Sequence, residues 1–115
     1  MNRKILPALI LSMALVAVTP ARASQAGSGT VSQILTIAET NSVLFIQTGT
    51  RTTVPTCGQA NPSRWAIAAG TPFGQAQLAV LLTAYAQRKQ VTIVGMNSCY
   101  RQSDTESVQY IVIND

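Results

Sequence analysis

Residues 70–96, GTPFGQAQLAVLLTAYAQRKQVTIVGM, decide the fold, because they predict one helix followed directly by one strand. Thr71 has the side chain of a helix N-cap and Pro72 suits the first helical position, so we expect a helix from about residue 73 or 75 to residue 88. The β-branched segment after it predicts a strand over residues 90–96. A single helix between strands limits the architectures open to the rest of the chain.

The predicted helix has two different faces. One is apolar and wide enough to cap a small β-core, with residues at positions i, i+3, i+4 and i+7: Leu78, Leu81, Leu82 and Tyr85. The other is uncharged and formed by small or weakly polar residues: Ala76, Val80, Thr83, Ala84 and Gln87. This second face is either plain surface or the contact with another subunit, and we favour the contact.

Four further segments read as strands. Those before the helix cover residues 30–38, 42–50 and 64–69, and the last covers residues 107–114. Irregular polar loops are expected over residues 51–63 and 97–105. The order β-β-β-α-β-β, with the helix between the third and fourth strands, is the OB-fold arrangement. We therefore expect a β-rich α+β domain: a small, partly open five-stranded barrel with one capping helix.

The first 23 residues have the pattern of a signal peptide. A basic start at residues 2–4 precedes an apolar run at residues 5–19, and Ala21-Arg22-Ala23 forms a small-x-small cleavage site. A membrane anchor is the alternative, but the apolar run is shorter than the roughly 20 residues that spanning needs. We expect residues 1–23 to be removed, residues 24–29 to be a flexible lead-in and residues 30–115 to be one domain. The product is a periplasmic or secreted protein with no membrane span after cleavage.

Removal of the leader changes the charge balance. Three of the eight basic residues belong to the leader, so the remaining chain is close to neutral despite a pI near 9.6. Only Arg88 and Lys89 are adjacent, and cations at that position favour the end of a helix. Nucleic-acid binding needs clustered cations and stacking aromatics, so we do not expect it even for an OB-fold.

The two cysteines favour a structural bond. Cys57 and Cys99 can pair in only one way, and an oxidising compartment favours that pairing. A catalytic thiol would need a neighbouring base, and the chain has no histidine. Asp104 and Glu106 are interpreted as solvated charges rather than an acid–base pair. We expect no enzyme activity, no cofactor and no metal site.

Local features spread over most of the exported chain resemble the OB-fold B subunits of AB5 toxins, of the subtilase-cytotoxin and typhoid-toxin type. They are Ser28-Gly29 before the first strand, Cys57 eight positions before Trp65, Arg88-Lys89-Gln90 leading into Val91 and Ile93, and Cys99. The resemblance implies a homo-pentamer with helices lining a pore, a toxin A subunit as partner and a glycan or host-surface ligand. Ser28 is the one glycan contact that it implies here. The chain departs from the family in a shorter segment after the fourth strand and in having no aromatic residue at positions 94–96.

Other candidate binding residues lie in the two loops. Tyr100 and Arg101 follow Cys99, where a disulfide would make the loop rigid, although a plain connecting loop is an equal alternative. Arg51 and Asn61 in the long loop have the same status, and Trp65 is interpreted as core rather than as a binding residue. Two function classes remain open: an oligomeric binding module, which we favour, and a monomeric structural or inhibitory protein that acts through protein contacts.

Overall fold

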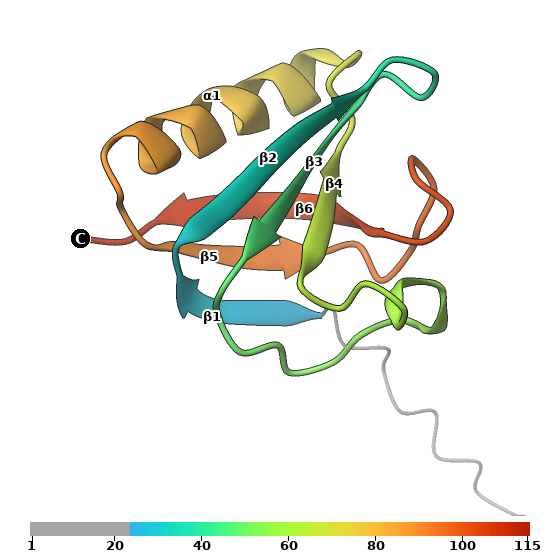
Figure 1. Ribbon diagram of the computed structural model, residues 1–115, viewed down its shortest axis with the longest axis horizontal. Coiled ribbons are helices and arrows are strands. Elements are labelled where there is room, and N and C mark those ends of the chain that lie inside the picture. Colours follow the sequence, from blue (N-terminus) through green and yellow to red (C-terminus); the bar gives the residue numbers. More distant parts are fainter. Residues whose placement is uncertain (1–23) are drawn as a thin grey trace, which may run out of the picture.

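The computed structural model describes residues 24–115, and the predicted signal peptide at residues 1–23 lies outside them. The described chain is mostly β, with a single α-helix (Figure 1). In chain order the elements are β1 (Gln25–Gly29), β2 (Val31–Ile37), β3 (Ser42–Gln47), the 3-10 turn η1 (Thr56–Gly58), β4 (Arg64–Ile67), α1 (Pro72–Ala86), β5 (Val91–Gly95) and β6 (Glu106–Ile113). The five expected strands are present, and β1 is an additional one.

The strands form one sheet in the order β1-β5-β6-β4-β3-β2. Neighbours are antiparallel except for β4 and β6, which run parallel. Because β1 and β2 lie at opposite ends of this order, the sheet is open, and the expected five-stranded barrel is not confirmed. In Figure 1, β2, β3 and β4 cross over β5 and β6, and α1 lies along the top, where it contacts β2, β4 and β6.

Strand β1 corrects the expectation of a flexible lead-in at residues 24–29. It pairs with β5, and the backbone N–H of Gly27 donates to the carbonyl of Thr50 at 2.9 Å. A Cβ at Gly29 would lie 2.2 Å from the backbone nitrogen of Gly49, so the two chains approach too closely for any side chain there. The small residues that resemble a linker are thus needed for close packing.

The core is built from alternate residues of the strands and from one stripe of the helix. Trp65 on β4 is fully buried, and the strand registers place it opposite Phe45 on β3 and Glu106 on β6. This burial supports the interpretation of Trp65 as a core residue. The other large, fully buried apolar residues are Leu44, Ile67, Leu81, Val91 and Ile93.

Helix α1 begins as predicted, with the Thr71 hydroxyl accepting from the backbone N–H of Gly74 at 2.9 Å. Its buried face differs from the prediction, because Leu82 and Tyr85 are exposed, whereas Gly74, Leu81 and Ala84 are buried. A Cβ at Gly74 would lie 1.8 Å from the carbonyl oxygen of residue 68, so the helix approaches the sheet through this glycine. That close approach rotates the helix away from the expected orientation.

The predicted disulfide is confirmed: Cys57 and Cys99 are bonded, with Cα atoms 6.2 Å apart. The bond joins η1 to the loop between β5 and β6, and it is compatible with an oxidising compartment. Within residues 24–115, no helix is long and apolar enough to cross a membrane.

Candidate functional site

The loop between β5 and β6, residues 96–105, is held in place from several sides. The disulfide fixes it at Cys99, and the backbone N–H of Ser107 donates to the carbonyl of Ser98 at 2.8 Å. Near its other end, the Asp104 carboxylate pairs with Arg64 at 2.7 Å. A loop tied at both ends loses less conformational entropy when it binds a partner.

The Asp104 carboxylate also explains where one predicted site residue lies. The side-chain amide of Asn61 donates to Asp104 Oδ2 at 3.2 Å, so Asn61 supports the loop from the side of the long second loop. The hydrogen bond from Arg64 lowers the pKa of Asp104 below its ordinary value of 3.8, and the hydroxyl of Thr105 adds to this effect. This carboxylate is therefore charged at neutral pH and serves to anchor the loop.

A hollow of ≈ 320 Å³ lies between this loop and the start of α1. Three large side chains on its wall are exposed to solvent: Phe73 by 71%, Tyr100 by 56% and Met96 by 45%. The guanidinium of Arg101 lies 5.2 Å from the centre of the Tyr100 ring, within cation–π range. The remaining lining residues are Ala68, Thr71, Gly74, Gln77, Val108 and Gln109.

The sequence-predicted residues do not form one site. Tyr100 lines the hollow, Arg101 contacts the Tyr100 ring without lining the hollow, and Asn61 supports the same loop through Asp104. Ser28 instead exchanges hydrogen bonds with Gln90 at 2.7 Å and Asn114 at 2.9 Å. Gln90 precedes β5 and Asn114 follows β6, whereas Tyr100 lies between these two antiparallel strands, so Ser28 lies at the opposite end of the strand pair.

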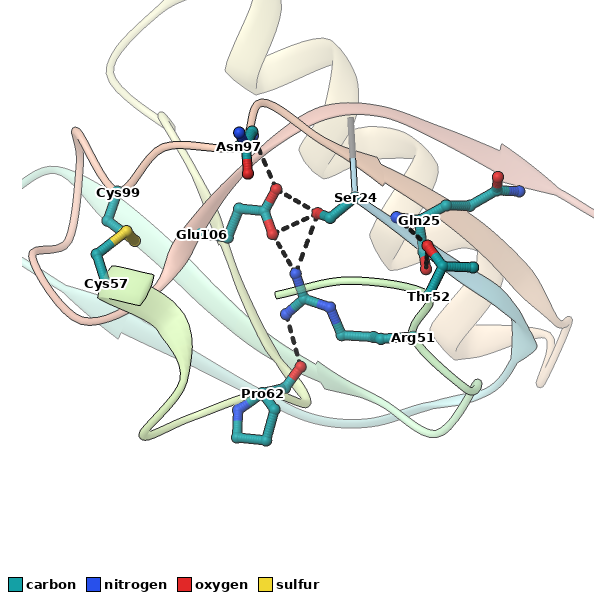
Figure 2. Close-up of polar contacts among 9 residues, drawn as sticks. All are labelled: Ser24, Gln25, Arg51, Thr52, Cys57, Pro62, Asn97, Cys99 and Glu106. Carbon is teal, nitrogen blue, oxygen red and sulfur yellow. Dashed lines mark hydrogen bonds and ion pairs between the residues drawn. A yellow bond between two sulfur atoms is a disulfide. The ribbon is translucent and has the colours of Figure 1, made fainter. Parts of the chain in front are cut away.

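Arg51 does not reach the surface. Its side chain is 6% exposed and forms an ion pair with Glu106, which is completely buried (Figure 2). A further bond runs from Arg51 to the carbonyl of Pro62 at 2.6 Å, and the guanidinium lies 3.9 Å from the centre of the Trp65 ring. The structure thus places Arg51 inside the protein. There it stabilises the fold and is not available to contact a ligand.

The burial of Glu106 corrects its interpretation as a solvated charge. Both of its carboxylate oxygens bond the hydroxyl of Ser24, and Oε2 also accepts from the backbone N–H of Asn97 at 2.9 Å. Desolvation lowers the pKa of Arg51, and the charge of Glu106 acts in the opposite direction. A buried ion pair keeps its charges only with such additional hydrogen bonds. We call Ser24, Arg51 and Glu106 the buried cluster.

Sequence reasoning did not identify several residues of these two sites. Phe73 and Met96 lie on the helix start and after β5, and only the fold brings them beside Tyr100. The sequence signal for Phe73 was its place directly after Pro72 in the first turn of the helix, where a side chain can lie outside the core. Ser24 and Glu106 are 82 positions apart, and no local pattern connects them.

The hollow presents side chains that can contact a ligand. Among residues 24–115 there is no group of three or more histidine, cysteine or carboxylate side chains placed to hold a metal ion. The hollow itself is lined by aromatic, aliphatic, hydroxyl and amide groups. Such a mixture is typical of sites that orient a ligand through apolar contact and a few hydrogen bonds.

A scan of protein-family models finds no match to this chain, and searches of curated proteins and of solved structures likewise find none. The relationship to AB5 toxin B subunits therefore remains a prediction from the sequence.

Proposed function

We propose that the protein is an exported, non-catalytic binding module of the B-subunit type, which binds a glycan or another surface ligand at the hollow beside Tyr100. The observation that carries this proposal is the exposure of Phe73, Met96 and Tyr100 around one hollow, where Met96 and Tyr100 belong to the loop that the disulfide ties down. Exposed apolar side chains that lie together mark an interaction site more often than scattered ones do.

The lining of the hollow suits a sugar better than a purely apolar ligand. Aromatic rings such as Phe73 and Tyr100 can stack on the C–H face of a sugar ring, while hydroxyl and amide side chains bond its hydroxyl groups. Thr71, Gln77 and Gln109 supply these polar groups, and the side-chain N–H of Gln77 already donates to the backbone of Gln109 at 2.8 Å. Gln77 is thereby held in position for a ligand.

We propose that the sheet curves into the OB-type barrel expected from the sequence. β1 and β2 follow each other with only Thr30 between them, so this one segment forms both ends of the strand order. β1 also bonds the chain that follows β3: Gly27 N–H to the Thr50 carbonyl, and Thr52 N–H to the Gln25 carbonyl, both at 2.9 Å. These contacts favour closure across the gap between the two ends.

We further propose that α1 mediates a homo-oligomer, a pentamer by the resemblance, on which a toxin A subunit could dock. The exposed stripe of the helix at positions i, i+3, i+4 and i+7 is Ala79, Leu82, Thr83 and Ala86. No residue from Pro72 to Gln87 is charged. Small, uncharged side chains allow a second helix to approach closely, whereas a solvated helix usually carries charges on this face.

The experiment that tests the site is glycan-array binding of the exported, oxidised protein and of two variants, Tyr100→Ala and Phe73→Ala. Tyr110→Ala is the matched control, because Tyr110 is 46% exposed but does not line the hollow. Loss of a stacking aromatic in a binding site costs about 1–3 kcal/mol, so each site variant should bind roughly 5- to 150-fold more weakly. Equal loss in all three variants, or in none, would contradict the proposed site.

The alternative is a monomeric structural or inhibitory protein that uses the same hollow to contact another protein. The exposed phenylalanine, tyrosine and methionine favour it to some degree, because these residue types are enriched in protein interfaces. A monomer in solution that binds no glycan but retains a protein partner through Tyr100 would support this alternative.

A further inference from the structure

The buried cluster lies apart from the proposed ligand site, and nothing in ligand binding requires it. Ser24 is 0% exposed, and its carbonyl accepts the backbone N–H of Gly95 at 2.8 Å. Its hydroxyl donates to the carboxylate of Glu106 and accepts from Arg51 at 3.2 Å (Figure 2). The first described residue of the chain is thus held as firmly as a core residue.

The surroundings of Ser24 are shaped to admit it. A Cβ at Gly95 would lie 1.9 Å from Glu106 Oε2 and 2.7 Å from the Ser24 hydroxyl, so only glycine leaves room for this pair. Four separate segments meet here: the start of β1, the chain after β3, the end of β5 and the start of β6. The position of Ser24 is therefore a built feature of the fold.

The same residue is the one that the predicted cleavage after Ala23 would expose as a new N-terminus. The backbone nitrogen of a serine lies about 3–4 Å from its own hydroxyl oxygen in any rotamer, because only three bonds separate them. Since that hydroxyl bonds Glu106, an α-ammonium at Ser24 would lie within about 6 Å of the carboxylate. At this distance opposite charges stabilise each other.

We propose that the α-ammonium of Ser24, released by cleavage, is the last member of the buried cluster and binds Glu106 beside Arg51. The inference rests on the proposed export of the protein. In the precursor the nitrogen of Ser24 belongs to an uncharged peptide bond, so Arg51 is the one cation paired with this carboxylate among residues 24–115. Cleavage after Ala23 thus adds a second cation beside Glu106 and stabilises the pairing of β1 with β5.

The first test compares thermal midpoints of the exported protein with two altered N-termini. N-acetylation of Ser24 removes the charge, and one extra alanine before Ser24 moves the ammonium away by one residue. Each should lower the midpoint by about 5 °C, the shift that a domain of this size shows for the loss of one good charge interaction. An unchanged midpoint in both would overturn the proposal.

The second test needs no variant. Periodate oxidises an N-terminal serine only when its amine and hydroxyl are both accessible, so the folded protein should react at least about 100-fold more slowly than the urea-unfolded protein. Equal rates would overturn the inference while leaving export and ligand binding intact. Mass spectrometry of the exported protein identifies its first residue. A chain that begins at a residue other than Ser24 would overturn both the inference and the predicted cleavage site.

Discussion

Substitution of Gly95 by alanine should destabilise the protein through the buried cluster alone. The new Cβ would lie 1.9 Å from Glu106 Oε2 and 2.5 Å from its Cδ, so the carboxylate must leave its position. Arg51 would then remain buried without its counter-charge, 3.9 Å from the centre of the Trp65 ring. No glycine of the described chain has a positive φ, so backbone strain does not contribute.

The expected size of this effect follows from two opposing terms. Breaking a buried ion pair while one charge stays behind costs about 3–5 kcal/mol. Replacing a strand glycine by alanine returns about 0.5–1 kcal/mol, because the unfolded chain loses conformational freedom. The net loss for Gly95→Ala is therefore about 2–4 kcal/mol, or a fall of roughly 10–20 °C in the thermal midpoint of a domain of this size.

Thermal and urea unfolding measured by tryptophan fluorescence suit this test, because Trp65 is the only tryptophan and lies against Arg51. Gly27→Ala is the matched control on the neighbouring strand, where the nearest atom to the new Cβ, Thr50 O, is 3.6 Å away. The control should leave the midpoint unchanged or raise it slightly. If Gly95→Ala behaved like the control, the buried cluster would not stabilise the fold in the way argued here.

Three further predictions concern the disulfide, the loop anchor and the helix stripe. Replacing Cys57 and Cys99 by serine opens a loop of sequence separation 42 and should cost about 4 kcal/mol on the chain-entropy model, measured by urea unfolding with and without reductant; an equal stability would refute the entropic argument. Because Arg64 lowers the pKa of Asp104, the stabilisation from this pair should be complete above about pH 4 and vanish as the pH falls further. Asp104→Asn should thus be less stable than the parent at pH 7, by less than about 1 kcal/mol for so exposed a pair, and the difference should shrink as the pH falls below about 4; a difference that does not shrink would contradict this assignment. Leu82→Glu should dissociate the proposed oligomer and change the stability of the single chain by less than about 0.5 kcal/mol, whereas an unaltered oligomer mass in light scattering would exclude the helix stripe as the interface.

Local sequence signals predicted the parts of the fold that local chemistry determines. The Thr71 N-cap and Pro72 placed the start of α1 correctly, since both act within one turn of the helix. The pairing of Cys57 with Cys99 followed from there being only two cysteines. The order of the five expected strands around the helix likewise depended on short segments of strand-forming residues.

Features that depend on distant contacts could not be predicted in this way. Gly29 in β1 resembles a linker residue until Gly49 is known to pass beside it. Glu106 resembles a solvated charge because its partners, Ser24 and Arg51, lie 82 and 55 positions away. The orientation of α1 depends on the contact at Gly74, which overrides the apolar periodicity of the helix.

The candidate site likewise contains residues that the sequence predicted and residues that only the fold revealed. Tyr100 was predicted because it follows Cys99 in a short polar loop, and the disulfide does anchor that loop. Phe73 could be added only from the fold, which brings the start of α1 beside the loop. Arg51 was selected as a loop cation, but its pairing with Glu106 offsets part of the cost of burying it.

The mass of the exported, oxidised protein in solution, measured by light scattering after size exclusion, tests the central claim most directly. The chain that the predicted cleavage would leave has about 92 residues, and the proposed closed ring of the B-subunit type predicts a mass of roughly five protomers. A protein that stays monomeric at micromolar concentration would contradict the ring. It would make the exposed stripe of α1 ordinary surface and leave protein contact through the hollow as the better account.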